Sequence, residues 1–131
     1  MDFSCDGTML ASIGLDDDHT ILLHYWKSGQ LLASVVGHKD RIFMIRWNPY
    51  QDGQLVTVGV KHLKFWNRVG STMKSNRGIL PKDKKNTTLL SIAFSQEKIP
   101  KDNESNVSEQ FLFTGGSDGN FIFHALCTII P

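Results

Sequence analysis

The sequence predicts an all-β protein. Short runs of β-branched, aromatic and other apolar residues recur along its 131 residues, and turn signals rich in Gly, Asp, Asn and Pro separate them. No segment sustains the apolar period of 3.6 residues that marks an amphipathic helix. The apolar content of 40% suits a globular core. The expected strands span residues 9–13, 20–26, 31–36, 42–47, 55–58, 63–66, 89–94, 111–114 and 121–126.

An internal repeat refines this fold class. An aromatic residue recurs at Phe3, Trp47 and Phe94, a spacing of 44 and then 47 residues. A second marker, a glycine after a strand that ends in small residues, recurs at Gly14, Gly59 and Gly115. A repeat of about 40–45 residues with four short strands is typical of a WD-type propeller blade.

The repeat predicts a partial WD40-type β-propeller of about three four-stranded blades. Residues 1–36 are expected to form a partial blade, residues 37–78 a complete one, and residues 79–131 an atypical one. The first and last blades are expected to be truncated, because the chain starts and stops within the repeat pattern. A polar insertion near residues 96–110 interrupts the last blade, and we expect it to form a long surface loop.

Each blade is expected to carry residues that hold its strands together. In WD-type blades, a His before the first strand typically lies near a Ser or Thr on the second strand and a Trp on the third. An Asp in the turn between strands two and three completes that hydrogen-bonded chain. The middle blade offers His38, Thr57 and Trp66 but has no Asp in its turn, whereas the last blade offers Asp118 but no Trp. We therefore expect atypical blades that depend mainly on apolar packing.

The sequence predicts no enzyme. It has no nucleophile elbow, no phosphate-binding loop and no cysteine beside a basic partner. The residues Asp16, Asp17 and Asp18 favour a tight turn over a cation site, because adjacent carboxylates point in different directions. His38 is expected to be structural, while His19 and His62 lie in or beside turns and are expected to be solvated. We predict no catalytic residue, no cofactor and no metal.

Charge and composition limit the possible partners and compartment. The net charge of +1 produces no global field that would attract nucleic acid or a membrane surface. The two cysteines, Cys5 and Cys127, are expected to be free thiols of a reducing compartment. No apolar run approaches the roughly 18 residues that a membrane-spanning helix needs. These features favour a cytoplasmic protein that binds other proteins.

Three segments of the first part of the chain resemble the echinoderm microtubule-associated protein-like family. They are residues 14–21, residues 37–43 and, most specifically, residues 56–66 with the sequence VTVGVKHLKFW. The resemblance covers residues 2 to 78, and beyond Gly78 only the WD-like pattern continues. It implies an atypical propeller that is associated with tubulin and microtubules. The chain departs from the family at His24 and Tyr25, where family blades have Trp-Asp.

One loop face is the expected partner surface. The turn before the first strand and the turn between strands two and three of the middle blade carry Lys39, Arg41 and Lys61. Tubulin is acidic overall, so these cations are its expected contacts, although ordinary solvated charges would give the same pattern.

Two other functions fit the sequence. The chain could be a generic WD-repeat adaptor for another protein partner, or an incomplete isoform without a function of its own.

Three blades cannot close a ring, and a propeller usually closes with four to eight blades. Two sheet edges would therefore remain open to pairing with other chains. We expect the chain alone to be unstable or to aggregate. Thermal unfolding followed by circular dichroism checks this expectation, and a sharp, reversible transition of a soluble monomer would contradict it.

Overall fold

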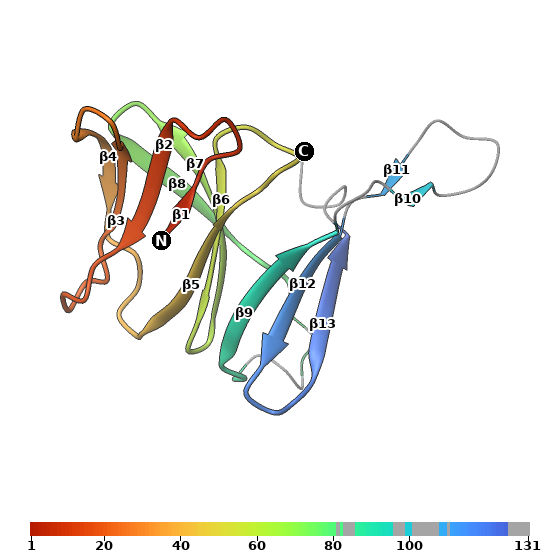
Figure 1. The fold of residues 1–131 in the computed structure, drawn as a ribbon. Coiled ribbons are helices and arrows are strands. Elements are labelled where there is room, and N and C mark those ends of the chain that lie inside the picture. Colours follow the sequence, from red (N-terminus) through yellow and green to blue (C-terminus); the bar gives the residue numbers. More distant parts are fainter. Residues whose placement is uncertain (81, 83–85, 96–98, 101–107, 110, 126–131) are drawn as a thin grey trace.

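The computed structural model describes residues 1–80, 82, 86–95, 99–100, 108–109 and 111–125. Three antiparallel sheets of three or four strands stand side by side in it, in chain order (Figure 1). The first sheet contains β1 (Asp2–Phe3), β2 (Met9–Ile13), β3 (Ile21–Tyr25) and β4 (Gln30–Val35). The central sheet contains β5 (Ile42–Trp47), β6 (Gln54–Gly59), β7 (His62–Val69) and β8 (Thr72–Arg77). The third sheet contains β9 (Leu89–Phe94), β12 (Phe111–Gly116) and β13 (Phe121–Ala125).

The predicted fold class is confirmed. The sheets of three or four antiparallel strands are those of partial propeller blades, and every strand expected from the sequence is present within one to three residues at each end. The sequence did not predict β8 as a strand. Within the expected insertion at 96–110, the described residues form two short paired strands, β10 (Ile99–Pro100) and β11 (Ser108–Glu109). The rest of that insertion, and the end of the chain where a fourth strand is expected to be incomplete, lie outside the described residues.

An apolar core joins the first sheet to the central sheet. Alternation along the strands places one set of side chains from each sheet at this interface. Ala11 and Ile21 of the first sheet and Leu55 of the central sheet are completely buried there. The buried members of the cluster are Ala11, Ile21, Leu23, Ala33, Ile45, Trp47, Leu55, Trp66 and Met73.

A second apolar core joins the central sheet to the third sheet. Its buried members are Val56, Val58, Leu63, Phe65, Leu89, Ile92 and Leu112. Because β6 contributes Leu55 to one core and Val56 to the other, every residue of this strand is buried. The central sheet is therefore covered on both faces, whereas strand β8 has only Met73 buried.

Polar contacts reinforce the boundary between the first and the central sheet. The Asp2 carboxylate accepts a hydrogen bond from the backbone N–H of Trp47 at 3.0 Å, and the Asp2 carbonyl accepts one from the Trp47 indole at 3.0 Å. At the other end of the boundary, the backbone N–H of Gly37 donates to the Asp18 carbonyl at 3.1 Å. The first two bonds join strand β1 to the end of strand β5, and the third joins the β2–β3 turn to the segment that leads into strand β5.

Gly59 ends strand β6 at a point where the backbone of strand β5 comes very close. A Cβ atom at this position would lie 2.2 Å from the Arg41 carbonyl oxygen and 2.8 Å from the Ile42 Cα. The N–H of the next residue, Val60, donates to the same carbonyl at 3.0 Å. Only a residue without a side chain permits this contact between the strands.

Replacing Gly59 by Ala should destabilise the chain by about 1–3 kcal/mol, because backbone atoms rather than a flexible side chain must move. Gly14 occupies the corresponding position of the first sheet, but a Cβ there would meet the end of the Asp16 side chain. Gly14→Ala is therefore the matched control and should destabilise less. Urea unfolding of both variants measures the difference, and equal losses would contradict the explanation.

Candidate functional site

A chain of buried hydrogen bonds crosses the face of the β6–β7 hairpin. The Trp66 indole N–H donates to the Thr57 hydroxyl at 2.9 Å, and that hydroxyl lies 2.6 Å from Nε2 of His62. The indole can only donate, so the hydroxyl accepts from it. The direction of the Thr57–His62 hydrogen bond depends on the tautomer of the imidazole, because a hydroxyl can also donate or accept a second time.

The strand register explains why these three side chains meet. Trp66 pairs with Leu55, Lys64 with Thr57, and His62 with Gly59. Side chains of directly paired residues share one face of the sheet, and diagonal neighbours on that face are within reach of long or aromatic side chains. Thr57 therefore lies between Trp66 and His62.

His62 is 2% exposed, so the expectation that it is solvated is wrong. Its place beside a turn suggested exposure, but the alternation of strand β7 directs it inward with Trp66. Burial lowers the pKa of His62 to about 3, and the nearby His38 and Lys64 act in the same direction. His62 is thus neutral at physiological pH. Its Nδ1 is buried and has no hydrogen-bond partner among the described residues.

The structure places His38 against His62 and does not bond it to Thr57 or Trp66. Its Nε2 lies 3.3 Å from the Val60 carbonyl oxygen, and its ring stacks against His62 at a centroid distance of 4.4 Å and a tilt of 41°. Burial lowers its pKa as well. His62 is therefore the histidine that completes the bonded chain, and sequence reasoning missed this role.

Asp118, which the sequence assigns to the network of the last blade, lies in the third sheet. It is exposed in the turn between β12 and β13, where its carboxylate accepts a hydrogen bond from the N–H of Asn120 at 3.0 Å.

The three expected partner contacts lie at one end of the central sheet. Lys61 is the exposed tip of the β6–β7 turn and has a left-handed backbone with φ of 52°. Lys61 lines a cavity of about 470 Å³ together with Lys39. Arg41 precedes strand β5, and its carbonyl accepts the hydrogen bond from Val60 that ties it to the same turn. We call the exposed residues Lys39, Arg41 and Lys61 the basic end.

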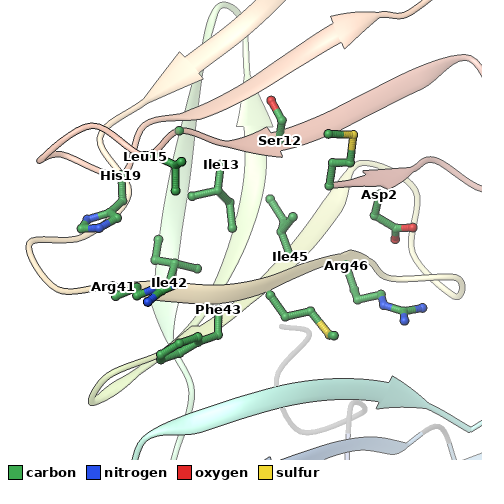
Figure 2. A pocket seen from close by; sticks show the side chains of 13 residues that line it. Asp2, Ser12, Ile13, Leu15, His19, Arg41, Ile42, Phe43, Ile45 and Arg46 are labelled. Carbon is green, nitrogen blue, oxygen red and sulfur yellow. The ribbon is translucent and has the colours of Figure 1, made fainter.

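A second cavity, of about 640 Å³, lies between strands β2 and β5 (Figure 2). Ile13 and Ile42 extend into the space between the two strands, while His19 and Arg41 lie at one end. The Arg41 guanidinium stacks over the Phe43 ring at 5.0 Å from its centroid. Arg41 therefore belongs both to the basic end and to the wall of this cavity.

The acidic turn forms the tight turn that the sequence favoured. The Asp16 carboxylate accepts hydrogen bonds from the backbone N–H and the hydroxyl of Thr20, at 3.1 and 2.7 Å. These bonds hold the pKa of Asp16 below its ordinary value.

In the part of the chain that the structure describes, no group of three or more His, Cys, Asp or Glu side chains could hold a metal ion. No helix among the described residues is long and apolar enough to cross a membrane.

Strand order, repeat spacing and packing define a segment of a WD-type propeller. Its resemblance to the echinoderm microtubule-associated protein-like family is confirmed by curated relatives. The chain is 29% identical to the 77 kDa echinoderm microtubule-associated protein of Lytechinus variegatus over 89 residues, which are 68% of this chain and 13% of that protein. It is 28% identical to human echinoderm microtubule-associated protein-like 1 over 103 residues, 77% of this chain and 13% of that protein.

A third relative is named for its association with cilia and flagella. The chain is 38% identical to mouse cilia- and flagella-associated protein 44 over 66 residues, which are 50% of this chain and 4% of that protein. No family model matches the chain. The chain thus spans only a small part of the curated relatives that it matches.

Thr57→Val should destabilise the chain by about 1–3 kcal/mol for each polar group that it leaves without a partner, here the Trp66 N–H and His62 Nε2. Val has nearly the same shape as Thr, so the decrease in stability measures the lost hydrogen bonds and not the effect of a cavity. Ser75→Ala on exposed strand β8 is the control and should change stability by less than about 0.5 kcal/mol. Urea unfolding followed by Trp fluorescence measures both, and a neutral Thr57→Val would exclude a stabilising network.

Proposed function

We propose that this chain is a segment of a microtubule-associated WD-repeat protein and that it acts as a non-catalytic binding module. The similarity to two proteins named as microtubule-associated carries the proposal. We further propose a cytoplasmic, cytoskeleton-associated location and no cofactor. The three sheets would correspond to the blade segments 1–36, 37–78 and 79–131.

The basic end is the surface that we propose for the contact. Lys39, Arg41 and Lys61 come from two loops that a backbone hydrogen bond holds together, so their charges are presented as one group. Within the described part of the chain, no carboxylate lies within 4.0 Å of these three side chains, so no ion pair reduces the positive charge that they offer to an acidic partner. Charge complementarity of this kind increases the rate of association and selects acidic partners.

Co-sedimentation with microtubules tests the proposal. The chain should pellet at about 50 mM salt and much less at about 200 mM, because exposed charges are increasingly screened. A variant with Lys39→Gln, Arg41→Gln and Lys61→Asn should remain in the supernatant at both concentrations. Asn is chosen at residue 61 because it tolerates the left-handed backbone.

The matched control removes three exposed cations elsewhere, with Lys27→Gln, Arg68→Gln and Lys74→Gln, and should still pellet. If both triple variants lose pelleting equally, the contact depends only on total charge and the basic end is not the binding surface. If the unmodified chain does not pellet at low salt, a generic WD-repeat adaptor for another protein is favoured.

A further inference from the structure

The 470 Å³ cavity extends behind the basic end and carries a strong excess of positive charge. It opens where residues 38–40 and the β6–β7 turn meet Arg77, the last residue of strand β8, and the Gly78 and Leu80 that follow it. Its basic and protonatable lining residues are His38, Lys39, Lys61, His62, Lys64 and Arg77. Asp40 is the acidic residue of the lining, and it lies 3.9 Å from His38.

Two of these cations lie directly opposite one another. Lys64 and Arg77 are paired residues of strands β7 and β8, an arrangement in which like charges repel. Burial and the charge of Arg77 both lower the pKa of Lys64. Within the described residues, neither cation has a carboxylate within 4.0 Å. The fold therefore concentrates positive charge at this wall without neutralising it.

His62 supplies a second, independent feature. This residue lines the same cavity, is 2% exposed and has an Nδ1 without a hydrogen-bond partner among the described residues. A buried polar group without a hydrogen-bond partner is unfavourable. Thr57 occupies Nε2, so Nδ1 is the ring nitrogen left for a ligand, and in the tautomer with its proton on Nδ1 it can donate to an anion near this wall.

The position of the cavity favours a polypeptide as the source of the anion. Arg77 ends strand β8, the outer edge of the central sheet, whose residues Lys74 to Arg77 are all exposed. An exposed strand edge can pair with an extended peptide. Lys39 and Lys61 are exposed at the mouth of the cavity, whereas Lys64 is partly buried. This arrangement of exposed cations at the mouth and a partly buried cation inside suits one inserted acidic side chain with further acidic residues on either side.

We propose that this cavity binds a carboxylate of an acidic polypeptide segment, with Arg77 and Lys64 holding the inserted carboxylate and Lys39 and Lys61 contacting its acidic neighbours. The inference deepens the proposed function, because Lys39 and Lys61 belong to both surfaces. It requires an acidic polypeptide, of which an acidic segment of tubulin would be one example. Arg77, Lys64 and His62 are new to the binding surface.

Fluorescence anisotropy with a labelled oligoglutamate peptide tests this proposal on the full chain. The oligoglutamate should bind at low salt, and an oligoglutamine of the same length should not. Arg77→Gln should weaken binding roughly tenfold or more, the loss expected for one charge-assisted hydrogen bond. Lys61→Asn, which keeps the left-handed turn, provides a second variant. Circular dichroism of each variant checks that the fold is kept.

Lys74→Gln is the matched control, because it removes one exposed cation from the same strand β8 outside the cavity. It should change the affinity less than twofold, a difference well below one charged contact. Equal weakening by Lys74→Gln and Arg77→Gln would overturn the proposal, as would equal binding of the two peptides. Displacement of the peptide by inorganic phosphate at lower concentration than by glutarate would overturn it in favour of a phosphate site.

Microtubule pelleting of the same samples separates this inference from the proposed function. Peptide binding that depends on Arg77, without pelleting, would support the cavity and contradict the microtubule role. Pelleting without any peptide binding would support the microtubule role and overturn the cavity.

Discussion

The central sheet depends on the two hydrogen bonds of the Thr57 hydroxyl group. This hydroxyl accepts the indole N–H of Trp66 and contacts Nε2 of His62, so one oxygen joins a side chain of strand β6 to two of strand β7. Each of these groups is buried, and an unpaired buried polar group is unfavourable. The bonds therefore fix the register of the hairpin. That register places Lys61 at the tip of the turn, and pairs Lys64 with Thr57.

The central sheet is packed against a neighbouring sheet on each of its two faces. Strand β6 sends alternate side chains into the two apolar cores, which requires a neighbouring sheet on each face. The loops at the end of this sheet carry the basic end and the charged cavity. Charged groups that must be held in a defined geometry are best placed on such a supported element. The apolar packing of the central sheet offsets the electrostatic repulsion between these cations.

Much of the fold follows from local sequence patterns, but two features did not. Strand β8 was missed because its sequence, TMKSNR, buries only Met73 and therefore lacks an apolar alternation. His62 was misjudged because its position beside a turn suggested exposure. A possible signal was the alternation His62, Lys64, Trp66, which places His62 on the face of a residue already expected to be buried. Among the site residues, sequence reasoning linked Thr57 to Trp66, and these two are hydrogen-bonded.

The sequence by itself determined the all-β class, the blade-like repeat and the resemblance to microtubule-associated proteins, because strand alternation, turn residues and repeat spacing are local properties. Only the tertiary structure decided which histidine joins Thr57 and that Arg77 lies opposite Lys64. The physical reason is that both of these contacts depend on strand register, which decides which residues face one another across a turn or between neighbouring strands. Register depends on burial, close backbone contacts and buried hydrogen bonds, and these exist only once the sheets have packed together.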